Sequence, residues 1–247
     1  MKLEVENLNI ARKGFSLKDI SFQVQDGAFF GIGGENGSGK TTLLKAIFGV
    51  TKAASGRIIV EGRDIYEMIP REIARKISYV PQETPLPMNL MVSDILDISS
   101  YSSPDRTISV EKAISICGIS KYVEREFSTL SGGEKRLVMF AASIAQDSDI
   151  ILMDEPTTFL DIEKRTRILS LMKNMKKMGK TIIGVFHELD ILYNFCDSII
   201  LLKEGRCMGS GNPGSVMNED TLRETFGVSF ALLDTEFGMR FEPRVEA

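Results

Sequence analysis

The positions of apolar residues divide the chain into distinct kinds of segment. Near the amino terminus, and again at residues 56–60, apolar and polar residues alternate; the apolar positions that set the early pattern are Leu3, Val5, Ile20, Phe22 and Val24. Alternation with a period of two predicts antiparallel strands with one exposed face. Residues 150–153, 182–186 and 199–202 are instead unbroken apolar runs, which are typical of parallel strands covered on both sides. Because helical segments separate these runs, the pattern predicts an α/β fold with a mainly parallel sheet flanked by helices and an amino-terminal antiparallel sheet.

A helical insert is expected in the middle of the chain. Residues 92–99 and 109–117 show helical periodicity, and a polar connection at residues 100–107 joins them. The preceding residues 81–87 contain three prolines, which exclude a regular element there. We therefore expect a single domain over residues 1–247. Its predicted parts are a core of residues 1–80 and 150–227, a helical insert of residues 92–147 and a hairpin-like extension of residues 228–247.

Composition narrows the classes of partner. The 247 residues carry a formal net charge of −4, which argues against a nucleic-acid partner because phosphate backbones are bound by clusters of Lys and Arg. No apolar run approaches the ~20 residues that span a bilayer, and the first residues lack the apolar stretch of a secretion signal. The three cysteines lie far apart, which argues against a disulfide framework or a zinc site. We expect a cytoplasmic protein with free thiols.

A glycine-rich loop carries the first chemical signal. It follows the apolar run at residues 28–32, precedes a segment of helical periodicity, and matches the pattern G-x-x-x-x-G-K-[ST]. With the next threonine, its residues are Gly34, Glu35, Asn36, Gly37, Ser38, Gly39, Lys40, Thr41 and Thr42. In such a loop the glycines let backbone N–H groups approach phosphates, Lys40 would reach the β- and γ-phosphates, and the Thr41 hydroxyl would bind magnesium. The alternative is a glycine-rich turn without a ligand, but the order of strand, loop and helix favours a nucleotide site.

Two adjacent carboxylates follow another buried run. Asp154 and Glu155 come directly after residues 150–153. Carboxylates at the end of a buried strand are costly without a cation or proton partner, which disfavours the alternative that they only cap the next helix. The phosphate loop and the carboxylates together predict a nucleoside-triphosphatase.

A second anion site is predicted at residues 130–134, Leu-Ser-Gly-Gly-Glu. This turn precedes a helix whose apolar face is formed by Leu137, Phe140, Ala141, Ile144 and Ala145. A Ser-Gly-Gly turn at a helix amino terminus presents backbone N–H groups to an anion. Two triphosphate cradles in one small domain suggest a head-to-tail dimer, in which each nucleotide lies between the first loop of one subunit and this turn of the other.

With these motifs in this order, the chain resembles the nucleotide-binding subunit of an ATP-binding cassette (ABC) transporter over nearly its whole length. The matching features are the Walker A loop at 34–41, the Q-loop glutamine Gln82, the signature motif at 130–134, the Walker B strand at 150–155, the D-loop aspartate Asp161 and the switch histidine His187. His187 is the sole histidine of the chain. Its place directly after the run at 182–186 favours the switch role over a structural one.

The resemblance implies ATP and Mg²⁺ as cofactors and a role for each motif. Asp154 would hold magnesium through its water shell, and Thr41 and Gln82 would complete the metal site. Glu155 would act as general base on the attacking water, while Lys40, Gln82 and His187 would act at the γ-phosphate. From the partner subunit, Ser131 and Gly133 would contact the γ-phosphate, and Gly132 and Asp161 are further implied nucleotide-binding residues.

The chain departs from the family pattern at several positions. Family members usually place an aromatic residue upstream of the Walker A loop to stack on adenine, but residues 9–14 contain none, which leaves Phe15 as the substitute. Glu35 stands where proline is common, Leu137 where arginine is common, and Phe159 where the D-loop usually has a small residue. These departures concern base selectivity and the dimer interface and leave the implied catalytic set intact.

The partners follow from the resemblance. Residues 221–228 and the hairpin-like segment 230–241 resemble the ATPases of iron-siderophore, haem and cobalamin importers, which implies membrane permease subunits, a separate substrate-binding protein and a place on the inner face of the membrane. The apolar segment 86–91 beside Gln82, with Met88 and Met91, would either receive a permease helix or fold over the protein's own core. One alternative function is a soluble ABC ATPase that acts as an ATP-gated clamp in assembly of another complex. Another is a regulatory module without turnover, against which Glu155 and His187 argue.

Overall fold

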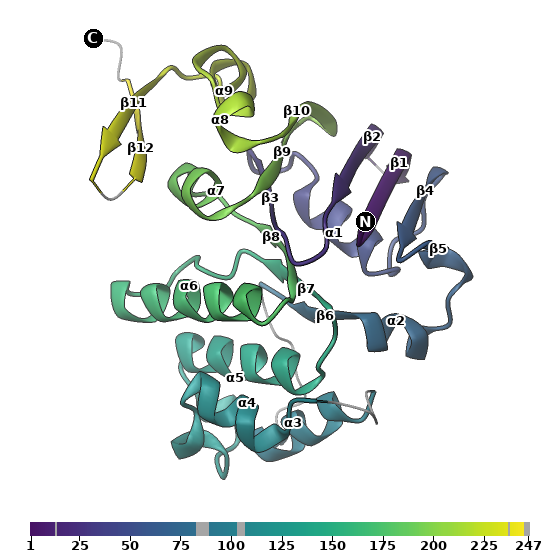
Figure 1. Cartoon of the computed structure of the whole chain (residues 1–247), viewed down its shortest axis with the longest axis vertical. Helices are drawn as coiled ribbons and strands as arrows, with labels where there is room; N and C mark the ends of the chain where they lie inside the picture. Colours follow the sequence, from purple (N-terminus) through teal and green to yellow (C-terminus); the bar gives the residue numbers. More distant parts are fainter. Residues whose placement is uncertain (13, 83–88, 103–106, 237, 245–247) are drawn as a thin grey trace. The chain divides into compact units, whose positions relative to one another are not determined.

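The computed structural model describes residues 1–12, 14–82, 89–102, 107–236 and 238–244. The chain forms two compact units, whose helices and strands are labelled in Figure 1. The first unit contains residues 1–68 and 183–247, and the second contains residues 69–182.

An antiparallel sheet opens the first unit. Its four strands, in the order β2-β1-β4-β5, are β2 (Phe15–Val24), β1 (Leu3–Arg12), β4 (Ser55–Val60) and β5 (Arg63–Asp64). Leu3 lies opposite both Val24 and Val60, and all three side chains are buried, whereas Glu4 and Gln23 pair on the other face. The alternation in the sequence therefore corresponds to one buried and one exposed face, and the expected amino-terminal antiparallel sheet is confirmed.

A second group of strands in this unit surrounds the strand that leads into the glycine-rich loop. Every residue of β3 (Phe29–Gly34) is buried, and β3 pairs in parallel with β9 (Ser198–Lys203). Strand β9 also pairs antiparallel with β10 (Arg206–Gly211). Helices α1 (Lys40–Ile47) and α7 (Leu189–Phe195) pack against β3, which accounts for its unbroken apolar sequence.

The remaining elements of the first unit are short. They are η1 (Ile65–Glu67), α8 (Pro213–Val216), α9 (Glu219–Phe226) and the antiparallel hairpin of β11 (Phe230–Thr235) and β12 (Gly238–Pro243). Helix α9 is capped by Asn218, whose side chain accepts a hydrogen bond from the Thr221 N–H, and is followed by Gly227 in a left-handed conformation. The hairpin expected from the sequence is confirmed, although Phe237, expected at its turn, lies outside the described residues.

The second unit contains a parallel strand pair and most of the helical residues. Strand β6 (Ile77–Val80) pairs in parallel with β7 (Ile150–Asp154). The helices are α2 (Pro70–Lys76), α3 (Val92–Ser100), α4 (Val110–Cys117), α5 (Gly132–Ala145) and α6 (Ile162–Lys177), with single turns η2 (Ser120–Tyr122) and η3 (Phe127–Thr129). Helix α5 packs on α3, α4 and β6, and its predicted apolar face is buried. Strand β8 (Thr181–Val185) begins in this unit and ends in the first.

The fold class predicted from the sequence is confirmed, with parallel pairs β3–β9 and β6–β7, an antiparallel amino-terminal sheet and a helical segment after residue 90. In the described part of the chain, none of the helices is both long and apolar enough to cross a bilayer. Residues 86–88 of the proposed docking segment, including Met88, and residues 103–106 of the predicted polar connection lie outside the described residues.

Candidate functional site

The glycine-rich loop joins β3 to α1 in the first unit and encloses the Lys40 side chain. Gly34, Gly37 and Gly39 adopt φ angles of 136°, 78° and 105°, a region that disfavours residues with a Cβ. A Cβ added at Gly34 would lie 2.1 Å from the Leu202 carbonyl oxygen, so this position accepts only glycine. Lys40 Nζ donates hydrogen bonds of 2.8 Å to the carbonyl oxygens of Gly34 and Glu35. The ammonium group is therefore held inside the loop.

The loop fits an anionic ligand in a second respect. Among the described residues, the Ser38 hydroxyl is buried and has no hydrogen-bond partner. A buried hydroxyl without a partner is unfavourable by about 1–3 kcal/mol, which a bound acceptor would remove. The Ser38 carbonyl oxygen accepts a 3.1 Å hydrogen bond from the N–H of Gly205, in the turn between β9 and β10. This hydrogen bond attaches the loop to the turn between β9 and β10.

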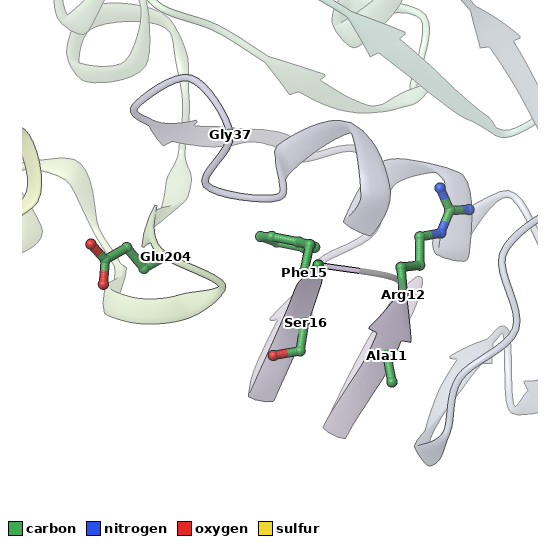
Figure 2. A pocket seen from close by; sticks show the side chains of 7 residues that line it. Ala11, Arg12, Phe15, Ser16, Gly37 and Glu204 are labelled. Atoms are coloured by element: carbon green, nitrogen blue, oxygen red, sulfur yellow. The ribbon is translucent and has the colours of Figure 1, made fainter.

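A cavity of about 500 Å³ lies beside this loop in the same unit, a size typical of small-ligand sites. Figure 2 shows the Phe15 ring below the loop that carries Gly37, with Arg12 on one side and Glu204 on the other. A Cβ added at Gly39 would lie 2.5 Å from the Phe15 ring, so the ring touches the phosphate loop directly. Arg12 is anchored by a 2.6 Å hydrogen bond to the Thr51 hydroxyl.

The carboxylate pair lies in the second unit at the end of β7. Asp154 is buried, and the Tyr79 hydroxyl donates a 3.2 Å hydrogen bond to its Oδ2. Burial raises the pKa of Tyr79, and the neighbouring Asp154 carboxylate raises it further, so the phenol stays protonated as a donor. Strand β6, which carries Tyr79, pairs with β7 and thereby aligns the two side chains.

Glu155 is held by its backbone and by its carboxylate. Its φ of 49° places a non-glycine residue in the left-handed region, and the Gln82 amide donates a 2.8 Å hydrogen bond to its Oε2. Arg136 of α5 donates to the Glu155 carbonyl oxygen at 3.0 Å and to the Asp154 carbonyl oxygen at 3.4 Å. Burial lowers the pKa of Arg136, and the negative charges of Glu155 and Asp154 oppose that shift. The second unit thus brings three predicted residues, Gln82, Asp154 and Glu155, to one place.

The Ser-Gly-Gly turn forms the amino terminus of α5. Ser131 caps the helix in a reciprocal arrangement, in which its hydroxyl accepts from the Glu134 N–H and the Glu134 carboxylate accepts from the Ser131 N–H at 2.8 Å. Hydrogen bonding to the Ser131 backbone lowers the pKa of Glu134. Ser131 and Gly132 are exposed, so the start of the helix lies at the surface.

Asp161 is linked to this turn through Lys164. Its carboxylate caps α6 by accepting from the Lys164 N–H at 2.8 Å, and it forms a 2.8 Å ion pair with Lys164 Nζ. The Lys164 side chain lies so close to Gly133 that a Cβ there would be 2.3 Å from its Cδ. The hydrogen bond from Lys164 lowers the pKa of Asp161. Between Glu155 and Asp161, the Phe159 side chain is 96% exposed and its φ is 60°.

His187 belongs to the first unit, two residues before α7. The preceding Phe186 donates its N–H to the Ile32 carbonyl oxygen of β3 at 3.1 Å, and its ring packs on Phe29. The predicted residues are therefore divided between the units: the loop residues and His187 lie in the first, and Gln82, Ser131–Gly133, Asp154, Glu155 and Asp161 lie in the second.

The oxygen donors required for Mg²⁺ are present in the predicted set. Within the described part of the chain, no group of three or more His, Cys, Asp and Glu residues is arranged to hold a metal ion. The hydroxyl of Thr41, the amide of Gln82 and the carboxylate of Asp154 are nonetheless the kind of ligand that Mg²⁺ accepts beside waters and phosphate oxygens.

Sequence reasoning missed Tyr79, Arg136 and Lys164. Arg136 stands next to Leu137, the position at which the family pattern has arginine, and Leu137 is buried on the apolar face of α5. Neighbouring residues of a helix point about 100° apart. Arg136 therefore points away from the buried apolar face on which Leu137 lies. The adjacent position supplies the guanidinium that reaches the Glu155 backbone.

Comparisons with known proteins identify relatives over most of the chain. A family profile described as ABC transporter matches residues 17–158. The iron(3+)-hydroxamate import ATP-binding protein FhuC of Bacillus subtilis is 30% identical over 86% of this chain and 82% of its own length. The cobalamin import ATP-binding protein BtuD of Halobacterium salinarum is 29% identical over 94% of this chain, which spans 60% of that protein's length. Among solved structures, the ADP conformation of an ATP-binding cassette of an ABC transporter has a TM-score of 0.79 and 25% identity, and the match covers 92% of this chain and 97% of that one.

Proposed function

Because this chain belongs to the ABC transporter family, we propose that it binds ATP with Mg²⁺, hydrolyses it and powers transport by a membrane permease. The observation that carries this proposal is the loop that encloses Lys40, with three left-handed glycines and a buried Ser38 hydroxyl that lacks a partner in the described structure. That arrangement fits a polyphosphate and is unfavourable without one.

The loop residues Gly34–Thr42 would bind the phosphates, with Lys40 as the positive charge nearest to them. Thr41, Gln82 and Asp154 would hold Mg²⁺. Bound there, Mg²⁺ would offset the negative charge that develops on the phosphate oxygens during transfer. The cavity lined by Phe15, Arg12 and Glu204 would take the base, and the Phe15 ring would supply the aromatic surface that residues 9–14 lack.

Glu155 would accept a proton from the attacking water. The hydrogen bond from Gln82 orients its carboxylate, and Arg136 fixes the backbone on either side of the Asp154–Glu155 bond. Tyr79 holds Asp154 in one orientation. His187 would donate to the γ-phosphate, and phosphoryl transfer would then depend on positioning and charge stabilisation by these groups.

The general-base role is tested by Glu155→Gln. The amide keeps the shape of the side chain but cannot accept the proton, so kcat for ATP hydrolysis should fall by at least about 100-fold. Binding of a fluorescent ATP analogue should persist. Glu124→Gln, an exposed carboxylate of the same unit, serves as the control and should hydrolyse ATP at the parental rate. A Glu155→Gln protein with parental turnover would remove Glu155 from the mechanism.

We infer that the active form is a head-to-tail pair of this chain. The exposed Ser131 and Gly132 at the start of α5 would contact a nucleotide held by the other subunit, together with Gly133 and Asp161. Phe159 at 96% and Ile162 at 85% exposure provide apolar surface next to Asp161. Gel filtration of the Glu155→Gln protein with ATP and Mg²⁺ should show a dimer, because blocked hydrolysis preserves the nucleotide that joins the subunits.

The transported substrate is proposed from the relatives. FhuC is named for iron(3+)-hydroxamate import and BtuD for cobalamin import, and both names support import of an iron complex or a related cofactor. Permease subunits, a substrate-binding protein and a location at the inner face of the membrane follow from that role. The chain should co-purify with a polytopic membrane protein. Failure to co-purify with a membrane protein would favour the soluble clamp.

A further inference from the structure

The hairpin of β11 and β12 lies along helix α7, which begins two residues after His187. In the first unit, α7 and β12 are in contact, and Figure 1 shows the hairpin near the carboxyl-terminal end of the described chain. An isolated two-stranded hairpin is only marginally stable in water. Its stability must therefore come from what it packs against.

Side chains of α7 bind the backbone of β12 at two points. Asn194 Oδ1 accepts a 2.9 Å hydrogen bond from the Met239 N–H, and its Nδ2 donates at 2.8 Å to the Met239 carbonyl oxygen. One helical turn earlier, Asp190 Oδ1 accepts a 3.1 Å hydrogen bond from the Phe241 N–H. The rings of Tyr193 and Phe241 pack with their centroids 5.4 Å apart.

The spacing of these contacts matches the two elements. Four residues of a helix advance about 6.0 Å, and two residues of an antiparallel strand advance about 6.8 Å. Asn194 and Asp190 therefore accept hydrogen bonds from the N–H groups of two alternate residues of β12. These N–H groups lie on the edge of β12 that does not face β11. The polar side chains of α7 take the place of a third strand and satisfy an otherwise open sheet edge.

Helix α7 in turn lies directly on the strand that precedes the phosphate loop. Cβ atoms added at Gly31 and Gly33 would lie 2.5 Å and 2.6 Å from the methyl groups of Leu192. Only glycines at these positions let the helix approach so closely. The carbonyl oxygen of Glu188, the residue next to His187, accepts backbone hydrogen bonds from the N–H groups of Ile191 and Leu192 in this helix. A displacement of α7 would thus reach both β3 and His187.

We propose that the β11–β12 hairpin positions His187. In this proposal, the hydrogen bonds between Asn194 and β12 restrain α7, and α7 restrains the histidine. The proposal rests on the proposed function, since it requires His187 to act in ATP hydrolysis. The hairpin restrains α7 on the side away from β3. The helix in turn fixes the position of the short segment between β8 and α7 that contains His187. Asn194 and Asp190 touch no reacting group and act only through the histidine.

Asn194→Ala tests this inference in the full-length protein. The variant loses both contacts to Met239, and kcat for ATP hydrolysis should fall about tenfold, while the KM for ATP changes less than twofold. Arg240→Ala, an exposed residue of the same strand, is the matched control and should retain the parental kcat. Asn194→Asp keeps the acceptor for the Met239 N–H and should recover part of the rate, and it serves as the second variant if Asn194→Ala does not fold.

A double-mutant cycle separates positioning from general stabilisation. If Asn194 acts through His187, adding Asn194→Ala to His187→Ala should lower kcat no further. Multiplicative losses, or a parental kcat for a folded Asn194→Ala protein, would overturn the inference. A wild-type chain that does not hydrolyse ATP would instead overturn the proposed function, so the two failures are distinguishable.

Discussion

The phosphate loop and the carboxylate pair are built in different ways. Lys40 is held by the carbonyl oxygens of Gly34 and Glu35, six and five positions earlier in the chain. Glu155 is held by Gln82, which precedes it by 73 positions, and by Arg136, which precedes it by 19. The hydrogen bonds of Lys40 lie within one continuous segment, whereas those of Glu155 require the second unit to be folded. Substitutions should therefore act locally on the loop and through tertiary structure on the carboxylates.

Removal of the loop's central charge should have the largest effect. Lys40→Ala deletes the ammonium group that the loop encloses, and ATP binding should weaken by about 100-fold, as expected for the loss of charge-assisted hydrogen bonds. Isothermal titration calorimetry with ATP and Mg²⁺ measures the change. Lys45→Ala, at the other end of α1, is the control and should bind like the parent. Equal affinities for Lys40→Ala and the parent would show that the loop is not a phosphate site.

Loss of a long-range contact should affect turnover more than binding. Arg136→Ala removes the donor to the Glu155 carbonyl oxygen, so the left-handed backbone at Glu155 loses a restraint and kcat should fall about 10- to 30-fold. The KM for ATP should stay within about twofold, since the phosphate loop is intact. Steady-state kinetics beside the exposed Arg71→Ala control would decide this. A variant that raises KM alone would contradict the division between the two regions.

A long-range contact away from the carboxylates should change stability without changing chemistry. Asp147 accepts hydrogen bonds from the Thr107 N–H and hydroxyl and pairs with Lys180 at 2.7 Å. Burial alone would raise the pKa of Asp147, but these partners outweigh it and lower the pKa. Asp147→Asn should lower the thermal midpoint at pH 7 by about 2–4 °C and leave kcat at 25 °C unchanged.

The pH dependence of that variant checks the cause. Because the folded-state pKa of Asp147 is depressed, its stabilising effect is present above the unfolded value of about 3.9 and is lost as the pH falls through the folded value. The difference in urea midpoint between the parent and Asp147→Asn should therefore narrow below about pH 4. A constant difference from pH 7 to pH 3 would mean that the carboxylate charge is not responsible.

The contrast between local and long-range contacts also explains which features could be predicted from the sequence. The loop, the buried strand β3 and helix α1 follow from contiguous residues, and Gly49 ends the helix in a left-handed conformation as expected. The antiparallel strands of the amino-terminal sheet also follow from local alternation. In contrast, β6 and α2 were not predicted, because a seven-residue helix and a four-residue strand are too short to give a clear periodic signal.

The partners of the predicted residues could not be read from the sequence. Tyr79 reaches Asp154 only because β6 pairs with β7, and Lys164 reaches Gly133 only because α6 passes the start of α5. Arg136 was passed over because Leu137 occupies the position at which the family has arginine. Which side chain points toward the carboxylates depends on how α5 packs. The domain limits and the roles of the site residues stay predictions.

At Glu155, backbone stability and the placement of a carboxylate favour different residues. Its left-handed backbone at φ 49° costs a residue with a side chain about 1 kcal/mol relative to glycine. A chain selected only for robustness would therefore replace it with glycine. In the proposed mechanism, this turn gives up part of the stability that glycine would allow in return for the placement of one carboxylate.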